Sequence, residues 1–183
     1  TFSDHALDIF WRTNSNTYLK HCIYYEKEWL DDIPASVISS DIDYIKRKYA
    51  GFNTNPDPRH LRIDNKAVVF VNNTTPIKKS GITDYQRKLA PKWNTIRKRK
   101  SIYTVLKVSN GWQNWKDKSN SWHQYEPSTP YGKVSGYSSY VSPGWWSPTQ
   151  KTPSLKRDIT RFTHNIKTMK SDRVPLHTIQ TWN

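Results

Sequence analysis

The chain is rich in aromatic and basic residues and poor in aliphatic ones. Its 183 residues include 9 Trp, 11 Tyr and 29 Lys or Arg, whereas Leu, Ile and Val together number 31. Aliphatic side chains fill protein interiors, whereas Trp and Tyr combine a large apolar face with a polar tip that suits interfaces. The composition therefore predicts a chain that builds only a small core of its own and lies against a partner.

Positive charge is concentrated after Asp64. Residues 1–64 contain 8 Lys or Arg and 10 Asp or Glu, a net charge of −2, whereas residues 65–183 contain 21 and 5, a net charge of +16. Such an excess favours an acidic partner, for example nucleic acid, an anionic lipid surface or an acidic protein lattice. With 34% apolar residues and a mean hydropathy of −0.90, the chain approaches compositions that stay disordered alone.

Cysteine content and hydropathy limit the cellular setting. The single cysteine, Cys22, excludes an internal disulfide framework and favours a reducing compartment. No apolar run reaches the ~18 residues of a membrane span, and no signal-peptide pattern opens the chain. Because the chain begins with Thr1 and its one methionine is Met169, we expect that an initiator was lost by processing or by truncation.

A small helical module is predicted for residues 1–52. One helix is expected from a cap at Ser3 to about residue 11, and a second from Thr17 to about residue 29. A third is expected from Ser40, as its amino-terminal cap, to about residue 49, because basic residues and then Gly51 follow.

Residues 53–109 are predicted to be a linker with two short strands and a basic helix. The runs 67–71 and 102–108 are rich in β-branched residues and are expected to form strands that pair as a ribbon. The segment 83–100 favours a helix that is interrupted at Pro91.

Residues 110–153 are expected to form an extended tail, because Trp, Tyr, Pro and Gly alternate there with polar residues without any helical or strand period. In residues 154–183, an apolar stripe predicts an amphipathic helix from Ser154 to about Lys170, followed by a tail. The predicted fold class is mostly α with long irregular segments, in which the tail becomes ordered through assembly.

The candidate partner-binding residues come from the basic run and from the aromatic tail. No Asp or Glu lies between Asp84 and Asp117, so the basic run favours contact with phosphates or an acidic surface. The aromatic rings are expected to fill pockets of a large partner. The candidates are Arg97, Lys98, Arg99, Lys100, Trp112, Trp115, Trp122, Tyr131, Tyr137, Tyr140, Trp145 and Trp146.

The motifs of catalysis and metal binding are missing from the sequence. The six histidines are scattered without metal-ligand spacing, and no glycine-rich phosphate loop or nucleophile elbow occurs. His21 and Cys22 are adjacent, which on a helix separates their side chains by about 100°. The carboxylate pairs Glu26/Glu28 and Asp31/Asp32 are not accompanied by a glycine-rich phosphate loop or a nucleophile elbow. We therefore expect no catalytic residue, no metal, no cofactor, no small-molecule substrate and no enzymatic activity.

Several short phrases resemble the microtubule inner proteins of cilia and sperm flagella. They are Thr83–Arg87, Ser128–Gly132, Ser135–Tyr140, Trp146–Thr149 and Thr152–Arg157. The resemblance covers residues 75 to 160 and concerns a style of Pro- and Gly-punctuated aromatic and basic segments. It implies an elongated structural protein in the lumen of axonemal doublet microtubules that contacts tubulin and neighbouring structural proteins.

Two other interpretations fit the composition. A basic RNA-binding protein of a mitochondrial ribosome would account for the charge and for a removed presequence. An accessory subunit of a mitochondrial respiratory complex would use the same kind of chain without contacting nucleic acid. The location expected from the sequence is thus the axoneme or, alternatively, the mitochondrion.

Overall fold

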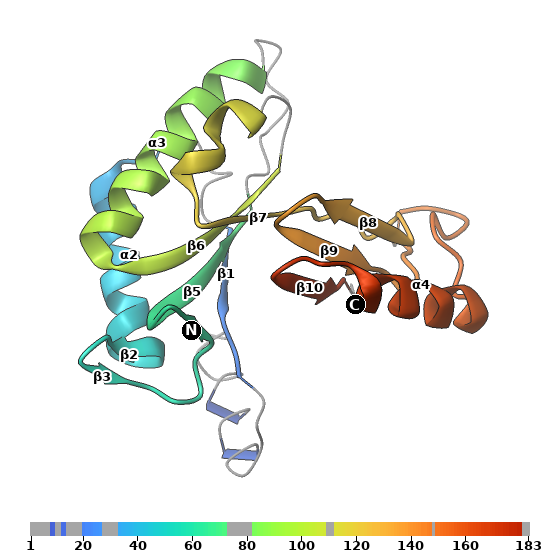
Figure 1. Ribbon diagram of the computed structural model, residues 1–183, viewed down its shortest axis with the longest axis horizontal. Helices are drawn as coiled ribbons and strands as arrows, with labels where there is room; N and C mark the ends of the chain where they lie inside the picture. The colour runs from blue at the N-terminus through green and yellow to red at the C-terminus, as the bar shows by residue number, and fades with distance from the viewer. Residues whose placement is uncertain are drawn as a thin grey trace.

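The computed structural model describes residues 8–9, 12–13, 20–26, 33–72, 82–108, 112–147 and 149–180, with the backbone alone for 82–88. It contains a larger sheet with helices on one face, and a smaller sheet with one helix (Figure 1). None of the described helices is long and apolar enough to cross a membrane.

The larger sheet is mainly parallel. Its strands β1 (Ile23–Tyr25), β5 (Lys66–Val71), β6 (Ile102–Lys107) and β7 (Ser121–His123) lie side by side in the order of the chain. The short strand β4 (Arg62–Ile63) pairs antiparallel with β5. The strands β5 and β6 are near-continuous apolar runs with buried residues on both faces, which is typical of parallel sheets: Val69 and Leu106 belong to the core with the helices, and Val68 and Val105 to a second buried cluster.

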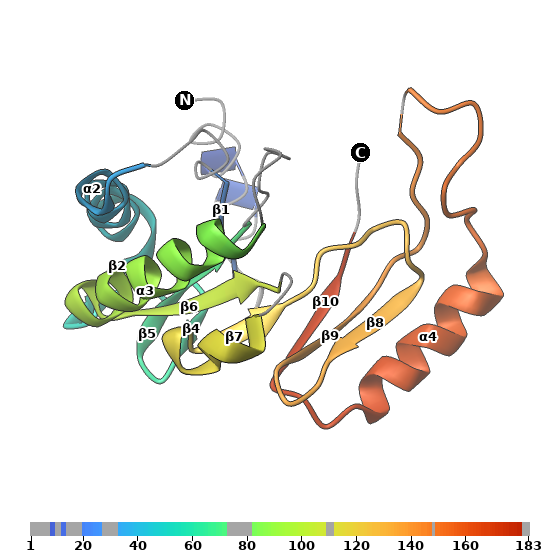
Figure 2. The ribbon, with the colours of Figure 1, turned by 90° about the horizontal axis from the view of Figure 1, so that it is seen from above.

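Two helices cover one face of this sheet. The helix α2 (Ala35–Ile45) continues into a π-helical turn, Lys46–Ala50, and packs beside α3 (Ile82–Lys100) (Figure 2). Their buried side chains meet those of the strands in one core, which contains Ile38, Ile42, Leu89, Trp93, Ile96, Val69, Leu106 and Trp122.

The smaller sheet contains β8 (Tyr131–Val134), β9 (Ser138–Val141) and β10 (Leu176–Ile179), in the order β10-β9-β8. The pair β8 and β9 is antiparallel, whereas β10 runs parallel to β9. The helix α4 (Ile159–Ser171) connects β9 to β10 and contacts β9. A 3-10 helix, Trp112–Lys118, precedes β7, and the pair β2 (Gly51–Phe52) and β3 (Asn55–Pro56) follows α2.

The predicted fold class was wrong. The chain is a mixed α/β protein with three sheets, and not a mostly α chain with a non-globular tail. Residues 110–153, expected to be irregular, contain the 3-10 helix, β7, β8 and β9. The core forms in spite of the few aliphatic residues because Tyr25, Trp93 and Trp122 are buried in it beside the aliphatic side chains.

Individual elements were predicted with mixed success. Both predicted strands exist, as β5 and β6, but they pair in a larger sheet. The expected helix 17–29 was wrong in its described part, where β1 lies, and the expected helix 3–11 lies largely outside the described residues. The third helix begins at Ala35 rather than after Ser40, and α3 continues through Pro91. The helix expected from Ser154 begins at Ile159, with Asp158 as its cap.

Candidate ligand site at the carboxyl end of the parallel sheet

Most of the aromatic residues expected to bind a partner lie against the protein itself. Trp122 and Tyr140 are each only 2% exposed. The ring of Trp112 lies 5.2 Å from that of Trp122 and 5.6 Å from that of Tyr137, measured between centroids. Trp115 packs against the same core. These rings therefore contribute to the fold of the chain.

Three further aromatic candidates lie in or beside the smaller sheet. The Tyr131 hydroxyl donates to Asp172 Oδ2 at 2.9 Å. Trp145 is half-buried and pairs through its backbone with Leu155. Trp146 is 59% exposed, so it is the candidate ring most available to a partner.

The basic run at the end of α3 is divided between internal contacts and solvent. Arg97 donates to the carbonyl oxygens of Lys118 and Asp117 at 3.2 and 3.0 Å. The Lys100 ammonium lies 2.6 Å from Asp43 Oδ2. Lys98 and Arg99 are exposed. Two of the four basic candidates, Arg97 and Lys100, thus hold α3 against the 3-10 helix and α2.

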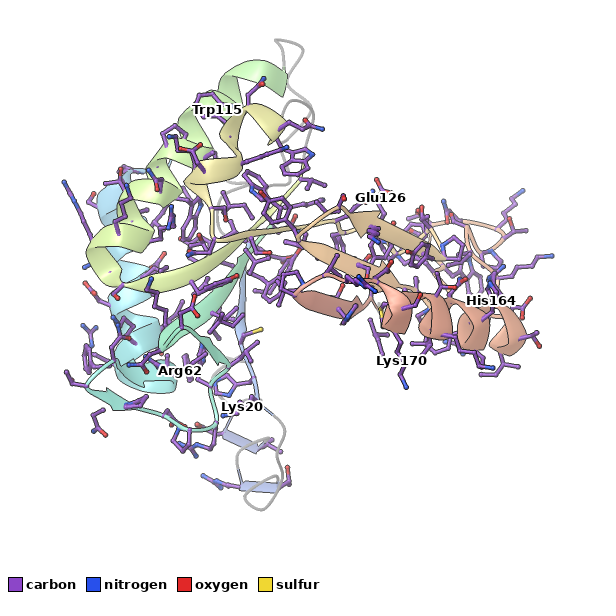
Figure 3. All side chains as sticks on the ribbon, viewed as in Figure 1. Lys20, Arg62, Trp115, Glu126, His164 and Lys170 are labelled. Atoms are coloured by element: carbon purple, nitrogen blue, oxygen red, sulfur yellow. The ribbon has the colours of Figure 1, made fainter. Side chains whose placement is uncertain are left out.

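A different group of side chains gathers where the parallel strands end. In parallel sheets, ligands bind beyond the carboxyl ends of the strands. The loops that follow the strands supply the functional groups there. Here β1 is followed by Glu26, β5 by Asn72, and β7 by Gln124–Glu126, while Lys107 ends β6 and His123 ends β7. Figure 3 labels Glu126 at the point where β7 leads into the smaller sheet.

Asn72 links the first two strands and leaves one polar atom unsatisfied. Its backbone nitrogen donates to Tyr25 O at 2.9 Å, and its Nδ2 donates to Glu26 Oε1 at 3.1 Å. The residue is 5% exposed, and its Oδ1 has no hydrogen-bond partner among the described residues. A buried acceptor without a donor costs free energy, so it marks a place where a ligand or water supplies the missing hydrogen bond.

Aromatic rings form one wall of this group. The ring of Tyr24 is stacked at 6.4 Å from that of Phe70 and lies 6.0 Å from that of Tyr125, measured between centroids. His123 packs edge-on against Phe70 at 5.2 Å. Tyr24 is 36% exposed, so part of its side chain is accessible to solvent.

The charges of the site are set by burial and by two carboxylates. Burial lowers the pKa of the Lys107 amine, while Glu126 and Glu26 act in the opposite direction. The Lys107 ammonium also lies 5.6 Å from the ring centroid of Tyr125, within cation–π distance. Burial and, to a smaller extent, Glu26 raise the pKa of both Tyr125 and Tyr24. Both phenols therefore stay protonated and can donate.

His123 is neutral at physiological pH. Burial lowers its pKa to about 4. Its Nε2 lies 3.3 Å from Val71 O, and since a carbonyl oxygen only accepts, this nitrogen carries the hydrogen. The imidazole therefore ties β7 to the end of β5 and adds no charge to the site.

The smaller sheet supports the same edge through Gln180. This residue follows β10 and is buried, and its side chain bridges two backbone positions beyond β7. Its Oε1 accepts from the Glu126 backbone nitrogen at 2.8 Å, and its Nε2 donates to Gln124 O. The position of Glu126 thus depends on both sheets.

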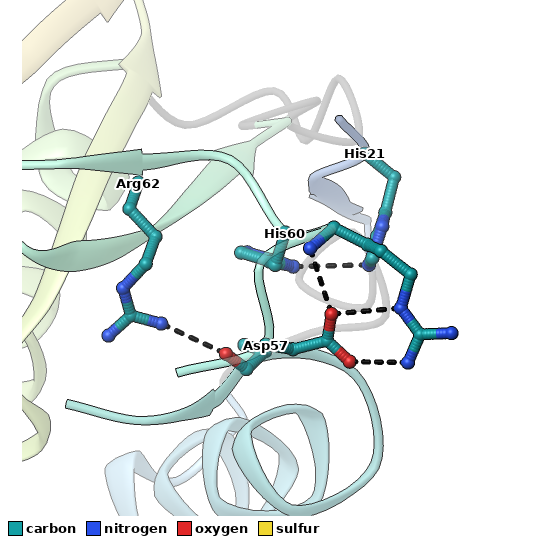
Figure 4. A network of polar contacts seen from close by, with 6 residues as sticks. His21, Asp57, His60 and Arg62 are labelled. Carbon is teal, nitrogen blue, oxygen red and sulfur yellow. Dashed lines mark hydrogen bonds and ion pairs between the residues drawn. The ribbon is translucent and has the colours of Figure 1, made fainter. Parts of the chain in front are cut away.

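A second polar cluster lies at the amino end of β1 (Figure 4). His60 Nδ1 lies 3.2 Å from His21 Nε2, and the Arg59 guanidinium binds both oxygens of Asp57 at 2.9 and 2.6 Å. Arg62 donates to Ala50 O and Asn53 Oδ1. These contacts join β4, the preceding loop and the start of β1, so the cluster is structural. Across the described ranges, no group of three His, Cys, Asp or Glu side chains could hold a metal ion.

The sequence analysis did not identify the residues at the carboxyl end as a group. In the sequence, Glu26 is one of a pair with Glu28, and His123 is one of six scattered histidines. The usable signal was the presence of polar residues directly after predicted strands, as at Asn72 after the run 67–71. Comparison of the chain with protein-family models, with curated proteins and with solved structures finds no match.

Proposed function

We propose that the carboxyl end of the parallel sheet binds a small, neutral, hydroxyl-rich ligand, such as a sugar. The observation that carries the proposal is the convergence of aromatic, amide and carboxylate groups from successive parallel strands. The partly exposed ring of Tyr24, the unsatisfied Oδ1 of Asn72 and the carboxylate of Glu26 belong to this one edge.

The chemistry of these groups favours a neutral ligand. Two carboxylates, Glu26 and Glu126, act on one ammonium, that of Lys107, so the group carries a formal charge of −1, which disfavours an anionic ligand. Carboxylate and amide oxygens accept from hydroxyl groups, and ammonium groups donate to them. Aromatic faces pack against the C–H surfaces of such a ligand, while a few placed polar groups orient it.

A ligand-binding test separates this proposal from a purely structural role for the edge. We expect saturation-transfer NMR to detect binding of at least one member of a panel of neutral mono- and disaccharides. Glu26→Gln should weaken that binding about tenfold or more, since one charge-assisted hydrogen bond contributes about 1.5 to 3 kcal/mol. The matched control is Asp117→Asn, which removes an exposed carboxylate from the 3-10 helix.

Two results would count against the proposal. One is that no sugar of the panel binds to the folded wild-type protein. The other is that Glu26→Gln and Asp117→Asn leave binding equally unchanged. The proposal concerns binding alone, and the expectation that the chain is not an enzyme stays a prediction, which turnover of a bound sugar would contradict.

A structural role in a large assembly is a second candidate. The support for it is the exposure of Trp146, Lys98 and Arg99, which leaves these members of the predicted partner-binding set available to tubulin or to another acidic surface. Co-sedimentation with microtubules over a series of salt concentrations tests this role. Retention at high salt supports the microtubule inner protein, whereas loss of all binding in dilute buffer excludes that partner.

A further inference from the structure

The segment from Gly144 to Arg173 is strongly basic and contains few acids. It includes seven Lys or Arg residues and two acidic ones, Asp158 and Asp172. Asp158 Oδ1 accepts from the Arg161 backbone nitrogen at 2.9 Å and so caps α4. Asp172 accepts from Tyr131 and, at 2.7 Å, from Lys133. Both carboxylates are therefore engaged with groups other than the side-chain cations of this segment.

The cations of the segment point to solvent. Lys151, Lys156, Arg157, Lys167, Lys170 and Arg173 are all exposed. In the part of the chain that the structure describes, none of these six forms an ion pair. Uncompensated charges in one segment raise the local positive potential and attract polyanions.

The helix α4 has two different faces. Met169 is buried, and Asn165 Nδ2 donates to Pro130 O at 3.2 Å, so this side of the helix packs on the smaller sheet. His164, Lys167 and Lys170 recur at intervals of three residues and are exposed. They form a stripe on the other side, because residues three and four apart share a helix face. Figure 3 labels His164 and Lys170 on this helix.

An exposed tryptophan lies in the hairpin that leads to this helix. Trp145 and Leu155 exchange two backbone hydrogen bonds, at 2.9 and 3.0 Å, which holds the two arms together. The neighbouring Trp146 is 59% exposed, and its Nε1 donates to Gln150 O at 2.8 Å. Arg157 passes close to Gly144, since a Cβ added there would lie 2.8 Å from Arg157 Cγ. The contacts between the two arms therefore hold the aromatic ring and the first cations of the segment in one hairpin.

We propose that Trp146, the segment 154–157 and the exposed stripe of α4 bind single-stranded nucleic acid. Proteins that bind single strands without reading their sequence combine aromatic faces, on which bases stack, with cations that follow the backbone. Trp146 supplies the stacking face, and Lys156, Lys167 and Lys170 contact phosphates. An acidic protein surface would also attract the cations, but it would not offer the row of bases on which an exposed indole stacks. The proposal does not depend on the ligand site of the parallel sheet.

Fluorescence anisotropy with a labelled oligothymidine of about 12 nucleotides tests the proposal. We expect saturable binding that weakens as salt rises from about 50 to 200 mM, with a slope of about −0.7 for each phosphate contacted. Trp146→Ala should weaken binding at least about fivefold. Lys167→Gln with Lys170→Gln should weaken it and reduce the magnitude of the salt slope.

The matched control is the double substitution Lys98→Gln with Arg99→Gln, which removes two exposed cations from α3. We expect this control to bind the oligonucleotide more tightly than Lys167→Gln with Lys170→Gln does. Equal weakening by the two double substitutions would overturn the proposal, because it would reflect net charge alone. Absence of saturable binding at about 50 mM salt would also overturn it. If polyglutamate displaced the labelled oligonucleotide as effectively as unlabelled oligothymidine does, the surface would be assigned to acidic proteins instead. All altered residues are exposed, and circular dichroism checks that each variant is folded.

Discussion

His60 donates from its Nε2 to the carbonyl oxygen of Val68 at 3.1 Å, while its Nδ1 lies 3.2 Å from His21 Nε2. The carbonyl oxygen only accepts, so the hydrogen of the neutral His60 ring is on Nε2, and Nδ1 accepts from His21. His60 is completely buried. This one side chain therefore joins the loop before β4, the start of β1 and the strand β5.

We expect His60→Ala to destabilise the protein by about 2 to 4 kcal/mol. The substitution leaves a cavity and removes the partners of the Val68 carbonyl and of His21. Urea unfolding followed by circular dichroism measures the change. The exposed His164 provides the control, because His164→Ala should change the free energy of unfolding by less than about 0.5 kcal/mol. If both substitutions changed the free energy of unfolding equally, the buried contact between His60 and His21 would be contradicted.

Stability should decrease as the pH falls from about 6.5 to about 4. Burial lowers the pKa of both His60 and His123 to about 4, against an ordinary value of 6.5. Between these values the unfolded chain binds protons that the folded chain does not, so the free energy of unfolding falls with pH. Each histidine contributes a slope of up to about 1.4 kcal/mol per pH unit.

Urea titrations at several pH values test this dependence. The double substitution His60→Gln with His123→Gln should flatten the profile in that window, even if it lowers stability throughout. A wild-type profile that is flat between about pH 6.5 and 4 would show that the two rings are accessible to protons in the folded state.

Gly51 ends the turn after α2 in a conformation that other residues avoid. Its φ is 66° and its ψ 167°, and a Cβ at this position would lie 2.4 Å from Asp57 N. We expect Gly51→Ala to cost at least about 1 to 3 kcal/mol, since it adds a backbone clash to the strained dihedral angles. Thermal or urea unfolding measures this loss.

Gly136 is the matched control for this substitution. It also has a positive φ, 78°, but nothing lies within 4 Å of an added Cβ. Gly136→Ala should therefore cost only about 1 to 2 kcal/mol for the left-handed conformation. If Gly136→Ala were the more damaging change, the close packing described for Gly51 would be wrong.

Two tryptophans with opposite environments test the position of the core. Trp93 is completely buried, and its ring meets that of Tyr25 at 5.4 Å in a T-shaped arrangement. We expect Trp93→Ala to cost about 3 to 5 kcal/mol in the free energy of unfolding. Trp146→Ala should cost less than about 0.5 kcal/mol, because that ring is mostly in solvent. Chemical denaturation of both variants tests this: a larger loss for Trp146→Ala than for Trp93→Ala would place the core at the hairpin that contains Trp146.

The reliable sequence predictions concerned elements whose signal is local. The apolar runs 67–71 and 102–108 became β5 and β6, and the stripe of α4 was recognised from its period. The tail 110–153 was mispredicted because its strands are three or four residues long and are stabilised by distant partners. Ser138 in β9, for example, pairs with Leu176 in β10. A strand this short that is stabilised by a distant partner shows no recognisable hydrophobic alternation in its own sequence.

The ligand site was beyond local reasoning for a similar cause. Glu26 and Asn72 are separated by 46 positions, yet they share a hydrogen bond because β1 and β5 are neighbours in the sheet. Carboxylates and histidines in a sequence have only their chain neighbours as context. Residues from different strand ends come together only once the order of the strands is known.

By itself, the sequence determined the basic surface, the apolar runs of the central strands and the amphipathic nature of α4, because charge and periodicity are local properties of the chain. Only the tertiary structure decided that Trp93 and Trp122 lie in a core while Trp146 is exposed. It alone also decided which polar residues meet at the carboxyl end of the sheet. The same indole ring is stabilised by burial or by contact with a partner, and the packing of distant segments selects between these two environments.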